Sequence, residues 1–325
     1  MRYRSVCMPR AEQLSLFGLK VDDASVAPLA ETREPTAHTS LVAAVGAFHD
    51  EMIRRGLSQH TIKAFALDLK LFARFLGAER QIGFVSSRDI HNYMHWLKHE
   101  REIKSSLKSL ERRLTTLKVF FKWLSDSQAI GADPAAPVLH EHSTDPLPKI
   151  LNRDQVTGLL SVAKQAMTGE KPDARPYLLA SLLLHTGMKK SEVAGLLLEH
   201  IDVSDPRAPT LWVRYGNPRY ARKERRLTLP KDFAETLLTF RAQYRPTQRL
   251  LECSARNLEY VLTNLGKQAG LSEGVSFEGL RMTAAVRDYK SGMTTETMRK
   301  KYGLSEITWN SETLPRIKHL AEAPL

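Results

Sequence analysis

Apolar residues recur at intervals of three and four between residues 40 and 124, and this spacing limits what the chain can fold into. The clearest run is Ile62, Phe65, Leu69, Phe72 and Leu76. Side chains spaced in this way share one face of an α-helix, which must be buried against other helices. Similar runs lie before and after it. The pattern therefore predicts four helices packed as one all-α domain over residues 39–132.

Helix boundaries are also marked in the sequence. Gly56 is placed to end the first helix, and Ser58 is a natural N-cap for the second. A third helix is expected after Ser87, and a fourth from about Ser106. The residues of the fourth helix that are expected to face inward are Leu107, Leu110, Leu114, Leu117, Phe121 and Leu124.

Composition changes on both sides of this domain. Residues 1–38 are polar and irregular, which predicts a disordered tail. Four prolines fall within residues 133–150, and they predict an extended linker. Asn152 and Gln155 form a capping pair that opens a second domain over residues 151–325. Its helices surround one β-rich section near residues 210–230. The expected fold class is mainly α with a small antiparallel β-sheet.

The charge favours a polyanionic partner. Lys and Arg number 48 against 36 Asp and Glu, a formal net charge of +12. Such a surplus favours double-stranded DNA, because each neutralised phosphate releases condensed counterions. A generic basic surface is the alternative. No secretory signal or membrane-spanning run is seen. The two cysteines, Cys7 and Cys253, suggest neither disulfides nor a metal site, so we expect no cofactor and a cytoplasmic, nucleoid-associated protein.

A short apolar segment interrupts the polar tail. Gln13, Leu14, Leu16 and Phe17 resemble the QLxLF-type peptide that binds the bacterial replication sliding clamp. In such peptides, Leu and Phe fill a hydrophobic pocket. The alternatives are a segment that packs on its own domain and one without a role.

Four motifs follow one another in the second domain. Residues 186–192 read TGMKKSE, residues 222–230 read RKERRLTLP, residues 278–282 read EGLRM, and residues 302–304 read YGL. Together with the helical domain and the Pro-rich stretch, their order and spacing resemble the tyrosine recombinase, or phage integrase, family. The resemblance covers about residues 40–313.

The resemblance implies a particular architecture and chemistry. It implies a helical SAM-like core-binding domain and an α+β catalytic-type domain that form a clamp on duplex DNA. In the family, a tyrosine attacks a DNA phosphodiester while two arginines hold the phosphate oxygens. A lysine on a β-hairpin protonates the leaving oxygen, and histidines assist proton transfer.

The family's pocket positions are only partly retained. Lys189 stands where the first arginine is expected, and it keeps the charge without the bidentate fork. Lys223 fits the hairpin lysine and Arg281 fits the second arginine. Glu278 replaces a histidine with a carboxylate that repels phosphate. Two further positions lose their function, those of Leu304 for the second histidine and Thr313 for the tyrosine.

These departures predict a catalytically degenerate pocket that still contacts DNA. The side chains expected to contact DNA are Lys104, Lys108, Arg112, Lys189, Arg214, Arg219, Arg222, Lys223, Arg225 and Arg281. The alternatives are a solvated strand face for the hairpin residues and a structural role for Arg281, paired with Glu192 or Glu278. Trp309 is expected to pack in the core.

Three functions remain open. The first is a DNA-binding regulator, architectural factor or recombination partner, bound to DNA as a monomer or weak dimer. The second is a divergent active recombinase that cleaves DNA with Tyr302 or with a partner's residue. The third is an adaptor that links DNA to the sliding clamp through Gln13–Phe17. A related active recombinase is a further candidate partner, whereas a membrane and a small-molecule substrate are not expected.

Overall fold

The computed structural model describes residues 34–140 and 147–322. The chain divides into two compact units, Met1–Asp145 and Pro146–Leu325, each with its own core. The division falls within the stretch predicted as a linker. Within the described residues, no helix is long and apolar enough to cross a membrane.

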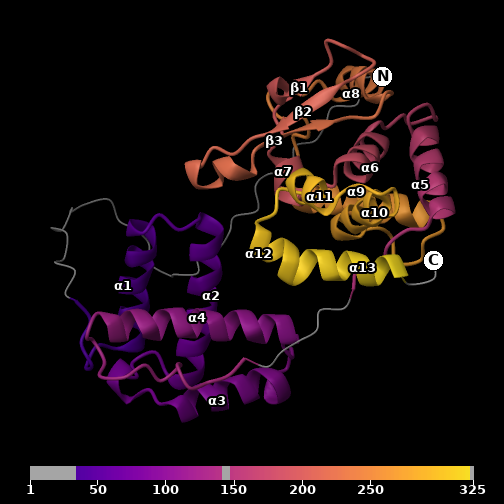
Figure 1. Cartoon of the computed structure of the whole chain (residues 1–325). Coiled ribbons are helices and arrows are strands. Elements are labelled where there is room, and N and C mark those ends of the chain that lie inside the picture. Colours follow the sequence, from indigo (N-terminus) through magenta and orange to yellow (C-terminus); the bar gives the residue numbers. More distant parts are fainter. Residues whose placement is uncertain (1–33, 141–146, 323–325) are drawn as a thin grey trace, which may run out of the picture. The chain divides into compact units, whose positions relative to one another are not determined.

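The first unit contains the four predicted helices (Figure 1). They are α1 (Leu41–Arg54), α2 (Gln59–Leu76), α3 (Ser87–His95) and α4 (Leu107–Asp126). A 3₁₀ turn, η1 (Ile82–Phe84), precedes α3, and a π-helical turn, η2 (Trp96–Glu100), extends it. Each α-helix begins after a serine whose hydroxyl accepts a hydrogen bond from an amide three residues later.

Aromatic side chains fill the first core. Phe72 lies edge-on to Tyr93 and Phe121, with ring centroids 5.0 and 6.0 Å apart, and Phe48 packs on Phe120 at 5.4 Å. These rings come from all four helices. The predicted inward faces of the helices are therefore largely confirmed.

Three expectations for the first unit need correction. Leu107 was expected inside, but 45% of it is exposed because the first turn of α4 borders a surface hollow. The predicted linker begins too early, because Ala135 and Val138 are buried in the first core. The predicted tail ends too late, because the carbonyl of Ala37 accepts a hydrogen bond from the Gly83 amide at 2.9 Å.

The second unit begins with helices and a three-stranded sheet. Its first helices are α5 (Arg153–Ala166), α6 (Arg175–Thr186) and α7 (Lys190–Ala194), followed by the turn η3 (Leu198–His200). The strands are β1 (Ile201–Asp202), β2 (Thr210–Val213) and β3 (Arg225–Thr228), antiparallel in the order β1-β2-β3. A 3₁₀ turn, η4 (Pro218–Lys223), closes the hairpin between β2 and β3.

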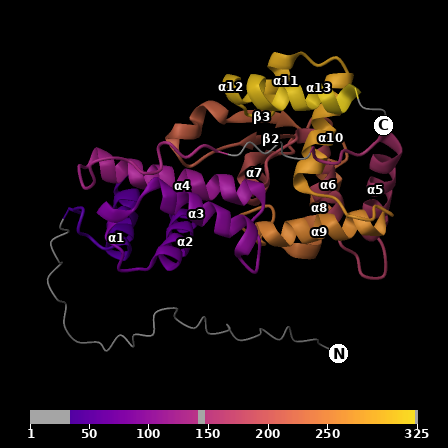
Figure 2. The same ribbon diagram turned by 90° about the horizontal axis from the view of Figure 1, so that it is seen from below.

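Helices make up the rest of the second unit. They are α8 (Phe233–Tyr244), α9 (Ala255–Gln268), α10 (Phe277–Lys290), α11 (Thr295–Lys301), α12 (Glu306–Thr308), the π-helical turn η5 (Trp309–Thr313) and α13 (Leu314–Glu322). Figure 2 shows α11, α12 and α13 gathered on one side of this unit and α9 on the other. The expected mainly α fold with a small antiparallel sheet is confirmed.

Two apolar clusters hold the second unit together. Helix α6 is buried on nearly all sides and packs against α5, α8, α9 and α10. A smaller cluster joins α10 to the C-terminal helices through Met298, Tyr302, Trp309 and Ile317. Trp309 is only 3% exposed, so its predicted place in the core is confirmed.

Candidate nucleic-acid interface

Four basic residues from three parts of the second unit influence one another at the proposed pocket. Lys189 precedes α7, Lys223 ends the hairpin turn, Arg225 begins β3 and Arg281 lies on α10. Burial lowers the pKa of Lys189, and the charges of Arg281, Lys223 and Arg225 lower it further, against the opposing effect of Glu192. The protein thus gathers positive charge at one site, where an anion would relieve the repulsion.

Glu192 is the anionic centre beneath this cluster. Its side chain is 1% exposed. Oε1 and Oε2 accept bonds from the two Nη atoms of Arg225 at 3.1 and 2.9 Å, and Oε2 accepts the Lys189 amide at 2.8 Å. The Tyr215 hydroxyl donates to the same carboxylate. Burial alone would raise the pKa of Glu192, but these hydrogen bonds and the charge of Arg225 lower it below its ordinary value.

Arg225 is therefore a structural residue, which contradicts its predicted contact with DNA. Only 9% of its side chain is exposed. Both Nη atoms bind Glu192, and its Nε donates to the Lys301 carbonyl at 2.6 Å. The partner proposed in advance for Arg281, Glu192, is thus taken by Arg225.

The protein satisfies only some of the hydrogen-bond donors of the Arg281 guanidinium. Its Nε donates to the Gly187 carbonyl at 3.0 Å, and Nη1 lies 3.7 Å from a carboxylate oxygen of the half-exposed Glu278. Its Nη2 is buried and has no hydrogen-bond partner among the described residues. A buried N–H without an acceptor is costly. A phosphate oxygen would satisfy it once the Arg281 side chain, which is 14% exposed, turned toward solvent.

Tyr302 lies behind this arginine and is closed off from solvent. It is 1% exposed, and its hydroxyl donates to Asp288 at 2.7 Å. Burial, with the adjacent Asp288 carboxylate, raises its pKa far above that of an ordinary phenol. The ring also packs against Gly187, where a Cβ atom would come within 2.2 Å of Cε1. A DNA phosphate cannot reach this hydroxyl in the described conformation.

The remaining pocket positions lie in dissimilar surroundings. Glu278 is half exposed beside Arg281, whereas Leu304 packs partly buried among the C-terminal apolar residues. Thr313 ends the π-helical turn η5 and is half-buried. Of the pocket positions, Lys223 and Arg281 lie close enough to Lys189 for their charges to lower its pKa, and the Lys189 amide binds Glu192.

The hairpin turn supplies a second basic surface. Arg214, Arg219 and Arg222 are exposed there, and Arg214 lies 4.0 Å from Glu224. The rings of Tyr215 and Tyr220 are 5.7 Å apart, and the Lys223 ammonium lies 5.1 Å from the centroid of Tyr220. These aromatic and cation–π contacts stabilise the turn against the repulsion between its basic side chains.

In the first unit, one residue predicted to contact DNA, Arg112, forms an ion pair. Arg112 donates through both Nη atoms to Asp68, a carboxylate that is 5% exposed and also accepts from the Thr116 hydroxyl. The Arg112 side chain stays 45% exposed beside this ion pair, so its contact with DNA stays a prediction. Lys104 and Lys108 are exposed, and Lys104 lies just before α4.

The sequence did not point to two of the acids that organise these sites, Asp68 and Asp288, and Glu192 was considered only as a possible partner of Arg281. Glu192 was visible as part of the TGMKKSE motif, and Tyr215 as an aromatic residue between basic ones. Nothing in the sequence marked Asp68 or Asp288, because their partners lie on other elements or behind the pocket.

Comparisons with known proteins agree with this architecture. The model described as "Phage integrase, N-terminal SAM-like domain" matches residues 46–128, and the one described as "Phage integrase family" matches residues 149–309. Tyrosine recombinase XerC of Staphylococcus haemolyticus is 25% identical over 288 residues, covering 84% of this chain and 90% of that protein. Tyrosine recombinase XerD of Halalkalibacterium halodurans is 29% identical over 157 residues, covering 48% of this chain and 51% of that protein.

Solved structures show the same fold. The crystal structure of a lambda integrase dimer bound to a COC' core site has a TM-score of 0.64 at 15% identity, covering 87% of this chain and 77% of that one. XerH site-specific recombinase bound to difH substrate has a TM-score of 0.61 at 16% identity, covering 87% and 85%.

Proposed function

This chain belongs to the phage integrase family of tyrosine recombinases, and we propose that it binds double-stranded DNA without cleaving it. In this proposal, Lys189, Lys223 and Arg281 hold one backbone phosphate. The exposed arginines of the hairpin turn contact the neighbouring backbone. The bound protein acts as a regulator, as an architectural factor or as the partner of an active recombinase.

The unpartnered Nη2 of Arg281 is the observation on which the DNA contact rests. A structural arginine, such as Arg225, has its donors satisfied by the protein. Arg281 is anchored through Nε, yet its Nη2 is buried without an acceptor. Together with the cations Lys189 and Lys223, this arrangement fits an anion that has oxygens on several sides.

Two features support the absence of cleavage. The family's tyrosine position is Thr313, whose hydroxyl is a far weaker acid than a phenol. The alternative nucleophile, Tyr302, is buried, and its hydroxyl donates a hydrogen bond to Asp288. A nucleophile must be both reachable and activated by a base, and neither residue meets both requirements.

A nicked suicide substrate tests both parts of the proposal. The purified protein is incubated with nicked DNA from its own genomic neighbourhood and resolved on native and denaturing gels. We expect a shifted band on the native gel and no covalent species on the denaturing gel. An adduct that disappears in Tyr302→Phe would instead support a divergent active recombinase, and no shift at low salt would contradict DNA binding.

The proposed adaptor role rests on sequence alone. Gln13–Phe17 lies outside the described residues, so binding to the sliding clamp stays a prediction. A pull-down of the clamp by the full chain, lost in Phe17→Ala, would support it.

A further inference from the structure

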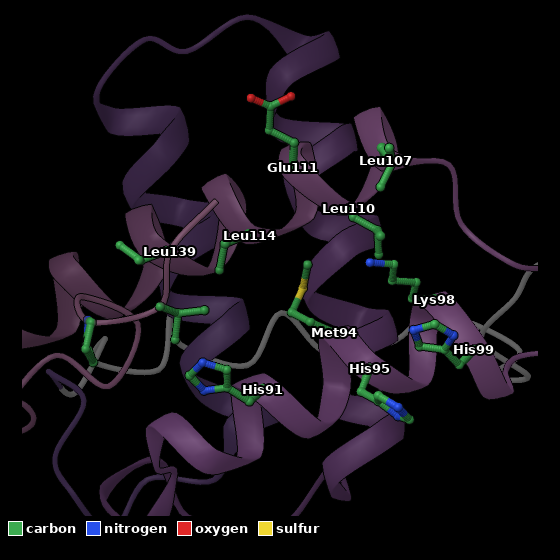
Figure 3. Close-up of a pocket in the computed structure, with 12 residues that line it drawn as sticks. His91, Met94, His95, Lys98, His99, Leu107, Leu110, Glu111, Leu114 and Leu139 are labelled. Carbon is green, nitrogen blue, oxygen red and sulfur yellow. The ribbon is translucent and has the colours of Figure 1, made fainter. Parts of the chain in front are cut away.

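A hollow of about 350 Å³ opens on the surface of the first unit (Figure 3). One wall is α3 with the turn η2, the other is the first half of α4, and the segment 137–139 completes it. Its apolar lining includes Met94, Leu107, Leu110, Leu114 and Leu139.

The floor of this groove is apolar and partly open to solvent. Leu110 and Leu114 are buried at its base, but Leu107 is 45% and Leu139 is 84% exposed. Figure 3 shows the α4 leucines on one side of the groove and Met94 facing them from α3. Leu107 and Leu139 thus leave apolar surface at the groove that a further segment could cover.

Polar side chains at the rim of the groove could set the orientation of a bound peptide. His91, His95 and His99 recur every four residues and so follow one face of α3 and η2. Glu111 is the acid on the opposite wall. An apolar floor with a few polar groups at the edge is the usual composition of a site that takes a short apolar sequence.

We propose that this groove receives Leu14, Leu16 and Phe17 of the same chain. These three side chains form a compact apolar set in an otherwise polar stretch. Leu14 and Leu16 would share one side of an extended segment, because side chains alternate along a strand. The set matches the exposed floor at Leu107 and Leu139 in chemistry.

The connection between segment and groove is short enough to favour this occupant over a separate protein. Residues 18–33 lead from Phe17 to Glu34, the first described residue, and Ala37 already contacts the first unit. A stretch of this length spans up to about 55 Å, whereas a domain of about 100 residues has a radius of gyration of about 13 Å. The tether therefore gives a millimolar-range local concentration, at which even a weak contact is populated.

Photo-crosslinking in the full chain tests this proposal independently of DNA binding. Phe17→p-benzoylphenylalanine is irradiated, and the crosslinked peptides are mapped by mass spectrometry. We expect crosslinks to residues 94–114 and 137–139. The double variant Leu107→Glu/Leu139→Glu should reduce the yield of these crosslinks about tenfold, because it places charges on the apolar floor. This loss corresponds to about 1.4 kcal/mol. Ile53→Glu, which alters another half-exposed apolar residue of the same unit, should leave them unchanged.

The outcomes are distinguishable. A mixture of ¹⁵N-labelled and unlabelled protein should give crosslinks within one isotopic population. Mixed-isotope products would assign the groove to a second copy and overturn the proposal, as would crosslinks spread over both units or none at all. Because Leu107→Glu could disturb α4, Leu139→Ser alone serves as a second variant. If crosslinking persists unchanged in both variants, the groove is not the site.

Discussion

Both Nη atoms of Arg225 donate hydrogen bonds to the Glu192 carboxylate, at 3.1 and 2.9 Å, inside the second unit. This pair joins β3 to the N-terminal end of α7 and so fixes the hairpin against Lys189. Two adjacent arginines thus have different roles. Arg225 is part of a buried ion pair, whereas Arg226 is exposed and pairs with the exposed Asp202.

Removing one partner of this buried pair should destabilise the second unit. Arg225→Ala leaves the Glu192 carboxylate buried without its main counter-charge, and breaking a buried pair costs about 3 to 5 kcal/mol. Urea unfolding followed by circular dichroism measures the change. Arg226→Ala, the adjacent control, should leave the unfolding midpoint nearly unchanged. Equal effects of the two substitutions would contradict the assignment.

The same carboxylate predicts a dependence of stability on pH. The pKa of Glu192 is lower in the folded protein than in the unfolded chain, so the unfolded state binds the proton more readily. The stabilisation is complete above about pH 4.3, the unfolded value, and is lost as the pH falls through the folded value. The stability difference between the wild type and Glu192→Gln should therefore shrink in acid. A difference that stays constant from neutral pH to pH 2 would refute this.

Arg281→Ala should weaken DNA binding in a way that reports one lost phosphate. Hydrogen bonds to charged groups contribute about 1.5 to 3 kcal/mol, so a loss of at least about tenfold is expected. The slope of log K against log salt should become shallower by about 1. Fluorescence anisotropy on duplex DNA at several salt concentrations measures both. Lys171→Ala, in the exposed loop before α6, should change neither quantity as much.

Reversing the exposed charges of the hairpin turn should also weaken binding. The triple variant Arg219→Glu/Arg222→Glu/Lys223→Glu should bind DNA at least about tenfold less tightly near 0.1 M salt, since phosphate contacts dominate affinity. Arg225 is left intact, because its replacement would perturb folding rather than binding. Circular dichroism of the variant should match the wild type. An unchanged affinity across the salt series would remove the hairpin from the interface.

Periodicity and capping residues predicted the helices well because these signals are local. Ser58 and Asn152 cap their helices as expected, each through its own side chain. The prediction for Leu107 was wrong because a regular stripe does not reveal where the neighbouring helix stops. Arg225 was assigned to DNA because its acidic partner, Glu192, is distant in sequence. Long-range pairs of this kind become visible only in the fold.

The contact between Gly187 and Tyr302 has a consequence for the order in which the protein matures. Gly187 adopts a left-handed conformation at the end of α6, and its carbonyl accepts a hydrogen bond from Arg281. The ring of Tyr302 packs directly against Gly187. These residues come from well-separated parts of the chain, and such contacts form late. The final position of Arg281 is therefore expected only once the segment with Tyr302 has packed against the end of α6.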